Sequence, residues 1–149
     1  MANINAIIAT ISSINNSADK LIIEELKKHN LDGLAPSHGN ILNVLYQNEE
    51  GVPMNKITQS INKDKSTVTA LVNKLLKMEL IEKIKCKEDS RSTIIKLSQK
   101  GLDTKPIVIN VISSKLLDTT YKGFTKEEKE LLCTLLEKIK KNFNTKGLK

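Results

Sequence analysis

The sequence contains no tryptophan, and aromatic residues make up only 3% of it. This scarcity argues against modules that bind single-stranded nucleic acids by stacking bases on aromatic rings. There are only two cysteines, Cys86 and Cys133, and neither has a second Cys or a His at metal-ligand spacing. The sequence therefore indicates neither a disulfide framework nor a zinc site, and we expect no metal, no cofactor and a reducing, cytoplasmic environment.

Long apolar runs are also absent. The N-terminal isoleucines are separated by Asn, Ser and Thr, and no basic residue precedes them, so we expect neither a signal peptide nor a membrane span. The two histidines, His29 and His38, fall in separate predicted helices without a catalytic motif around either. We therefore expect that the protein is not an enzyme.

Positive charge is abundant and unevenly distributed. The formal net charge is +7, which favours a polyanionic partner but is also typical of ribosomal and membrane-surface proteins. Between residues 56 and 91, eight lysines and Arg91 face five acidic residues, so +4 of the +7 lies in this segment. Because aromatic residues are few, duplex DNA is the more plausible polyanion.

The segment between Asp64 and Glu79 is predicted to form a helix with two different faces. Apolar residues recur at three-and-four spacing on one face, namely Val68, Leu71, Val72, Leu75 and Leu76. The other face carries short, polar or cationic side chains, namely Ser66, Thr69, Ala70, Asn73 and Lys77. Side chains of this kind allow a helix to lie close to base edges in a major groove.

Three further helices are predicted before this one. The apolar spacing indicates a long helix over residues 4–26, and Gly33 then breaks the chain. A second helix is expected from Pro36 until Glu49, and a short third helix has Pro53 in its first turn. Asn62 is expected in the left-handed conformation between helices, and Asp64 is expected to cap the helix that follows it.

The pattern changes after residue 79. Alternating residues at 81–86 and 93–98 predict two strands, and the polar tip at 87–92 lacks a tight-turn pair, so we expect a longer, mobile loop. A helix is expected from Ser98, with an interruption near Asp103 because of Pro106. Gly123 is expected to end it, and Thr125 with Glu128 predicts a capping box for a last helix.

In this order of elements, the chain resembles the MarR family of bacterial winged-helix regulators. The resemblance covers nearly the whole chain, and its most specific parts are residues 64–69, 89–91 and 95–101. It implies a mainly α fold with a small β-hairpin wing (α+β). It further implies one chain, 1–149, with a winged helix-turn-helix region at 34–101 and helical dimerisation regions at 1–33 and 102–149. Members of the family usually have a hydroxyl residue at the position of Ala35, where it caps the second helix. Ala35 departs from this pattern, and we expect Ser37 to serve as the cap instead.

Pattern and resemblance together nominate residues that contact DNA. In the recognition helix they are Lys65, Ser66, Thr67, Thr69, Ala70, Asn73 and Lys74. In the wing they are Lys85, Lys87, Asp89, Ser90 and Arg91. At the starts of other helices, where backbone N–H groups can meet phosphate, they are Ser37, His38 and Asn55, although such residues are more often helix caps. The alternative for the helix residues is an ordinary solvated face.

Individual roles follow from side-chain chemistry. Asn73 can bind an adenine edge with two hydrogen bonds, and Lys74 can bind a phosphate. Arg91 is the only arginine, and its planar guanidinium suits a narrow minor groove. The resemblance implies that Asp89 orients Arg91, whereas the alternative is an ion pair that only stabilises the hairpin. Cys86 lies between two lysines, which favours thiolate, but an incidental strand residue is the simpler interpretation.

We therefore expect a regulator that binds specific double-stranded DNA sequences. The resemblance implies a homodimer on a pseudo-palindromic operator, most simply a repressor, with activation as the alternative. It also implies a small-molecule effector that binds between the dimerisation helices and the winged region. Two other hypotheses remain: an architectural protein that coats DNA with little sequence preference, and a winged helix that binds only proteins.

Overall fold

The computed structural model describes residues 2–85, 88 and 92–144 and divides into two units, residues 1–116 and 117–149. Cys86, at the end of the first predicted wing strand, lies outside the described residues. So do Lys87, Asp89, Ser90 and Arg91 of the predicted wing tip, whereas Glu88 and Ser92 are described. The first elements in chain order are a 3-10 turn (Ile4–Ala6), α1 (Ile7–Lys28), α2 (Pro36–Tyr46), β1 (Val52–Pro53), α3 (Met54–Ile61) and α4 (Lys65–Lys77). The remaining elements are β2 (Ile81–Lys85), β3 (Thr93–Leu97), α5 (Gln99–Asp103), the π-helical segment η2 (Pro106–Ile112), α6 (Ser113–Thr120) and α7 (Lys126–Phe143).

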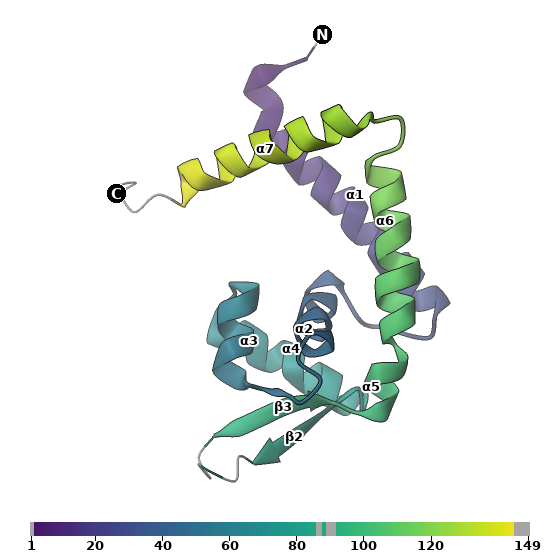
Figure 1. The fold of residues 1–149 in the computed structure, drawn as a ribbon, viewed down its shortest axis with the longest axis vertical. Coiled ribbons are helices and arrows are strands. Elements are labelled where there is room, and N and C mark those ends of the chain that lie inside the picture. The colour runs from purple at the N-terminus through teal and green to yellow at the C-terminus, as the bar shows by residue number, and fades with distance from the viewer. Residues whose placement is uncertain (1, 86–87, 89–91, 145–149) are drawn as a thin grey trace. The chain divides into compact units, whose positions relative to one another are not determined.

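The core of the first unit lies where α2, α3 and α4 pack on one another and on the sheet (Figure 1). The predicted apolar face of residues 65–77 is confirmed, because three of its side chains are fully buried and Leu71 and Leu76 are partly buried. The fully buried side chains of the core include Ile41, Leu42, Leu45, Ile57, Val68, Val72, Leu75, Leu80 and Ile95.

The wing belongs to a three-stranded antiparallel sheet with strand order β1-β3-β2. The hairpin register pairs Ile81 with Leu97 and Lys85 with Thr93, which confirms the two predicted strands. Strand β1 was not predicted, and the expected place of Pro53 was wrong. Pro53 pairs with Ile94 in β1 and is the N-cap of α3, which begins one residue later.

Backbone carbonyl groups join the end of α4 to the root of the wing. Glu79 adopts a left-handed conformation (φ 61°), which turns the chain from α4 into β2. The Ser98 hydroxyl donates to the carbonyl oxygen of Glu79 (2.6 Å), and the Ser98 N–H donates to that of Leu80 (3.0 Å). The Lys100 ammonium donates to the carbonyl oxygen of Met78 (3.0 Å). The wing is thereby held in one position relative to α4.

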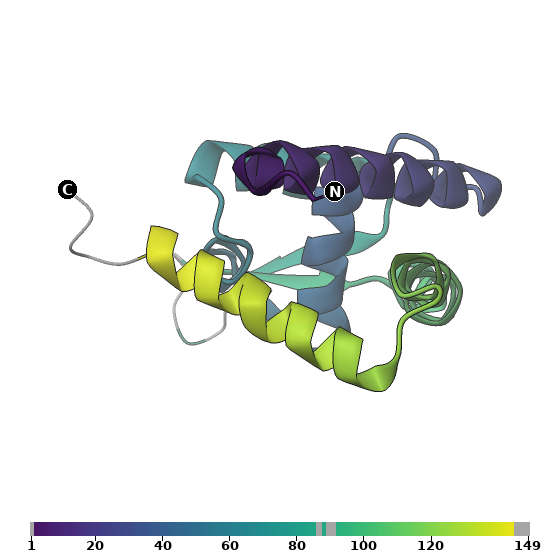
Figure 2. The same ribbon diagram turned by 90° about the horizontal axis from the view of Figure 1, so that it is seen from above.

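Helix α1 is continuous and crosses α2 (Figure 2). Its C-terminal part packs against η2, where Leu26, Val108 and Ile112 are buried. Its N-terminal part exposes apolar side chains, including Ile14 at 61%. None of the described helices is both long and apolar enough to cross a membrane.

The expected interruption before Pro106 is confirmed. Helix α5 ends at Asp103, and the chain continues as a π-helical turn from Pro106. Proline cannot donate a backbone hydrogen bond, so an α-helical ladder cannot pass through it. The Ser113 N–H and hydroxyl both donate to the carbonyl oxygen of Val108, five residues earlier, which stabilises the wider turn.

In the second unit, α7 begins with the predicted capping box. The Glu128 N–H donates to the Thr125 hydroxyl (3.1 Å), and the Thr125 N–H donates to the Glu128 carboxylate (2.9 Å). Gly123 has φ 81° and follows α6, as expected of a helix end. Cys133 is exposed, and its sulfur atom lies 3.5 Å from the Tyr121 hydroxyl oxygen.

We expect the Gly101→Ala substitution to destabilise the protein because Gly101 packs directly on the backbone. A Cβ atom at this position would lie 2.0 Å from the carbonyl oxygen of Leu80. Relieving the overlap requires a backbone shift, so the free energy of unfolding should fall by about 2–3 kcal/mol. Urea unfolding followed by circular dichroism measures this change.

The Gly39→Ala substitution is the matched control, because Gly39 is also helical and a Cβ atom there would meet nothing within 4 Å. It should raise the free energy of unfolding by about 0.5–1 kcal/mol through helix propensity alone. Equal effects of the two substitutions would contradict the proposed close packing at Gly101.

Candidate nucleic-acid interface

The polar face of α4 is open to solvent. Because Val68, Val72 and Leu75 are fully buried, the opposite side of the helix must point away from the core. All seven recognition-helix candidates are exposed, namely Lys65, Ser66, Thr67, Thr69, Ala70, Asn73 and Lys74. The structure therefore presents them on one accessible helix.

The start of α4 is fixed by the predicted cap. The Asp64 carboxylate accepts hydrogen bonds from the Thr67 N–H (2.7 Å) and from the Ser66 hydroxyl (3.1 Å). Hydrogen bonds from Thr67 and Ser66, together with the Lys63 charge, lower the pKa of Asp64. Asn62 has the left-handed conformation expected between the helices (φ 51°). The turn between α3 and α4 is thus set by two polar residues.

Lys74 turns toward the loop between α1 and α2. A Cβ atom added to Gly33 would lie only 3.1 Å from the ammonium nitrogen of Lys74. The imidazole of His38 is buried, and burial together with the Lys74 charge lowers the pKa of His38. A phosphate bound by Lys74 would therefore lie near the start of α2.

His38 has a structural role at the start of α2. Its Nδ1 atom accepts a hydrogen bond from the backbone N–H of Ala35 (2.9 Å), and Ala35 is the N-cap residue. The cap position is therefore at Ala35 itself and not at Ser37, which is half-buried in the first turn. This geometry favours the capping interpretation of His38 over a phosphate contact.

Asn55 and the root of the wing lie together. Asn55 is exposed in the first turn of α3, and with Pro53, Met54, Ser92 and Thr93 it lines a cavity of about 360 Å³. Lys85 is exposed at the end of β2. The other wing candidates, Lys87, Asp89, Ser90 and Arg91, lie outside the described residues. The described His, Cys, Asp and Glu residues form no group of three that could hold a metal ion.

Two positioning features were missed by sequence reasoning. The packing of Lys74 on Gly33 joins residues far apart in sequence, and a helical pattern cannot show it. The contacts of Ser98 and Lys100 with backbone carbonyls of residues 78–80 were also missed. The signal that could have revealed the contacts of Ser98 and Lys100 is the resemblance of the segment 95–101 to the MarR family.

Comparison with known proteins identifies the family to which this chain belongs. A family model described as transcriptional regulator SarA/Rot matches residues 19–106. The chain belongs to the SarA/Rot family of transcriptional regulators. Its similarity to the HTH-type transcriptional regulator SarZ of Staphylococcus haemolyticus is 26% identity over 118 residues, which covers 78% of this chain and 75% of SarZ.

Two solved structures show the same fold. A MarR mutant from E. coli, complexed with operator DNA, has a TM-score of 0.78 at 18% identity and covers 93% of this chain and 99% of its own. The transcriptional regulator SlyA has a TM-score of 0.79 at 20% identity, covering 92% and 93%. The expected MarR-like winged-helix fold is therefore confirmed. The family comprises transcriptional regulators, so the expectation that the protein is not an enzyme is also confirmed.

We expect Asp64→Asn to preserve the α4 cap and Asp64→Ala to remove it, because both Asn and Asp accept backbone hydrogen bonds at an N-cap. At pH 7 the alanine variant should therefore be less stable than the wild type, and the asparagine variant should be close to it. Urea unfolding of the three proteins measures this ranking.

The advantage of wild-type Asp64 should also depend on pH in one direction. Its pKa is lowered in the folded state, so its contribution is complete above the ordinary Asp value of about 3.9. That contribution is lost as the pH falls through the lowered folded-state value. A gap between wild type and Asp64→Asn that widens on acidification would contradict this role.

Proposed function

We propose that this regulator binds specific double-stranded DNA sequences as a homodimer in the cytoplasm and acts as a repressor. The observation that carries the proposal is the exposed polar face of α4, opposite a fully buried apolar face. A helix mounted in this way can enter a major groove without losing its packing. The structural likeness to a MarR protein crystallised with operator DNA supports the same interpretation.

Dimerisation is supported by apolar side chains exposed near both ends of the chain. In α1 and the preceding turn they include Ile4 (86% exposed), Ile8 and Ile14. In α7 they include Leu131, Leu135 and Phe143. Exposed apolar surface of this extent marks an interaction surface. A two-fold dimer would present two α4 helices to half-sites about one helical turn apart.

Within the interface, the side chains divide into two kinds of contact. Asn73 reads a base edge, because its amide both donates and accepts. Lys65 and Lys74 bind phosphates, which positions the helix without reading sequence. In the wing, Arg91 reaches the minor groove and Asp89 orients it. A small-molecule effector that binds between the dimerisation helices and the winged region releases the operator by changing the separation of the reading helices.

An architectural DNA-binding protein is the second candidate, and the net charge of +7 favours it. A protein of this kind would bind duplexes of any sequence with similar affinity. The ratio of specific to random affinity separates the two functions.

Asn73→Ala and Lys74→Ala should have different effects on DNA binding. Loss of Asn73 should reduce affinity for the preferred duplex and spare random DNA, because only a base contact is lost. Loss of Lys74 should weaken binding to all duplexes similarly and reduce the slope of log affinity against log salt by about one. Fluorescence anisotropy at several salt concentrations measures both quantities.

The exposed Lys126 in the second unit, far from α4 in sequence, supplies a charge-loss control for this experiment. Lys126→Ala should change neither the sequence preference nor the affinity appreciably. The assignment of Asn73 is wrong if its substitution lowers affinity equally for specific and random duplexes.

Selection of bound duplexes from a random pool tests the proposed function itself. The purified protein should enrich an inverted repeat, which it should bind at least about a thousandfold more tightly than scrambled DNA at physiological salt. Sedimentation of the complex should show two chains per duplex. Enrichment without a motif would support the architectural function instead, and absence of duplex binding at low salt would overturn both.

A further inference from the structure

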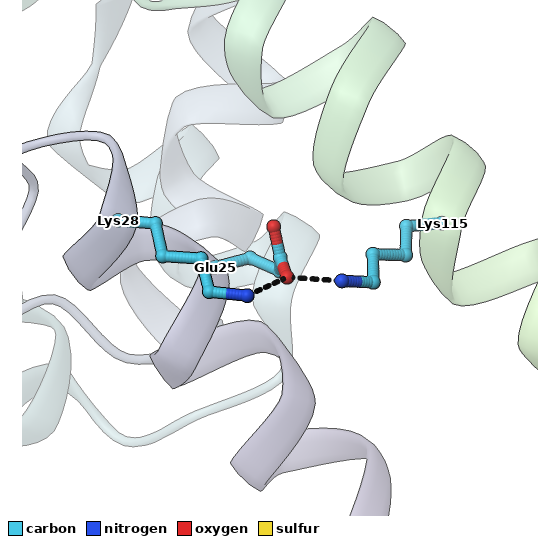
Figure 3. Close-up of polar contacts among 3 residues, drawn as sticks. All are labelled: Glu25, Lys28 and Lys115. Atoms are coloured by element: carbon cyan, nitrogen blue, oxygen red, sulfur yellow. Dashed lines mark hydrogen bonds and ion pairs between the residues drawn. The ribbon is translucent and has the colours of Figure 1, made fainter.

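A buried acidic residue links α1 to α6. The Glu25 side chain is only 7% exposed, and its Oε1 atom accepts hydrogen bonds from two lysines. Lys28 belongs to the same helix and is 3.2 Å away, whereas Lys115 belongs to α6 and is 2.5 Å away. Figure 3 shows the two ammonium groups approaching the same carboxylate oxygen from two sides. Hydrogen bonds from Lys115 and Lys28 lower the pKa of Glu25.

The ion pair lies at one end of α1, so a small change of the helix angle at the pair produces a large displacement at the other end. Glu25 lies near the C-terminal end of α1, which packs on α2 and η2, whereas the exposed Ile7 and Ile8 lie at the other end. At 1.5 Å per residue, Ile7 is about 27 Å from Glu25 along the helix axis. A tilt of about 10° at Glu25 would move the N-terminal end of α1 by about 5 Å, more than the 3.4 Å rise of one base pair.

The apolar contacts at this end of α1 do not by themselves fix its direction. Leu26 packs against η2, in which Val108 and Ile112 are buried, and apolar contact is non-directional. Lys28 belongs to the same helix as Glu25 and moves with it, so this contact places no constraint on the register between helices. Lys115 reaches the carboxylate only if α1 and α6 keep their register, because a shift leaves the buried carboxylate without its partner from α6. The Glu25–Lys115 pair thus selects one angle among those that the apolar contacts allow.

We propose that the Glu25–Lys115 ion pair fixes the angle between α1 and the continuous helical segment η2–α6, and thereby determines which half-site spacing the dimer accepts. This segment is tied to α2, α3 and α4 because its Val108 and Ile112 belong to the same apolar core. This inference rests on the proposed function, in which the N-terminal part of α1 contributes to the dimer interface. Glu25 and Lys115 are then positioning residues. They determine the preferred half-site spacing through the angle of α1 and make no contact with DNA.

The test is a selection of duplexes from a random pool by the wild type and by the variants Glu25→Gln and Lys115→Met. The wild type should enrich an inverted repeat at a single spacing. Both variants should enrich the same half-site but at several spacings. Their preference for the original spacing over one with two added base pairs should fall by about tenfold, a change comparable to one mismatched base pair. Because Lys115 is half-exposed, its variant should fold even if Glu25→Gln does not.

Two control variants separate positioning from a general loss of stability. Tyr46→Phe removes a buried hydrogen bond of 2.7 Å between the Tyr46 and Thr104 hydroxyls, which joins α2 to the C-cap residue of α5. It should lower the melting temperature but leave the spacing preference unchanged. Lys28→Met removes the partner of Glu25 on its own helix and should also leave the spacing unchanged.

The double variant Glu25→Gln/Lys115→Met should relax the spacing no further than either single variant, because both remove the same interaction. The inference is overturned if the wild type shows a single spacing and all variants keep it, a result that leaves the proposed function intact. It is also overturned if Tyr46→Phe relaxes the spacing as much as Glu25→Gln does. A wild type that enriches no inverted repeat would overturn the proposed function as well.

Discussion

The burial of one face of α4 is the constraint on which the rest of the first unit depends. Val68, Val72 and Leu75 have no exposed surface, and they contact a core that includes the equally buried Ile41 and Leu45 of α2. Burying each side chain of this kind contributes about 1.5–3 kcal/mol, so rotation of α4 about its axis would cost several times the energy of any surface contact. The polar face is therefore held outward by the core, and no contact on that face is needed to keep it there.

The wing depends on the same helix through a different interaction. Where α4 ends at Lys77, the chain turns through residues 78–80, whose carbonyl groups lie beyond the helix and are costly if they are left unpaired. Ser98 and Lys100, from the far side of the hairpin, donate to the carbonyl oxygens of Glu79 and Met78. Gly101 allows this close approach, because any larger side chain would collide with the Leu80 carbonyl. The end of the reading helix and the root of the wing are thus one hydrogen-bonded structure, and their relative position is fixed before any DNA is bound.

Features that arise from local chemistry could be predicted from the sequence, and those that arise from distant contacts could not. Periodicity gave the two faces of α4, and the chemistry of Asn62, Asp64 and Thr125 gave the helix ends. Strand β1 has only two residues, too few for an alternating pattern, and forms because Val52 meets Ile95. The cap of α2 was misplaced because the Nδ1 atom of His38 accepts a hydrogen bond from the N–H of Ala35, which requires that Nδ1 carries no proton. Burial lowers the pKa of His38 and thereby favours the neutral imidazole. The candidate DNA-contacting residues of α4 could be predicted from the same helical periodicity as its core residues, because the side chains opposite a buried face are exposed.

The charged residue at position 25 is informative, because burying an apolar side chain there would cost less free energy than burying a carboxylate. Removing a carboxylate from water is costly, and both of its lysine partners are about half-exposed or more, so burial of Glu25 is poorly explained by stability alone. Nor is the pair suited to sensing pH near neutrality. The pKa of Glu25 is lowered, so its contribution is complete above the ordinary Glu value of about 4.3 and is lost only as the pH falls through the lowered folded-state value. At this end of α1, the ion pair adds to the apolar contacts of Leu26 a polar contact that forms in one register of α1 and α6. In the proposed dimer, whose two α4 helices would have to match the pitch of DNA, that register is a property on which selection can act.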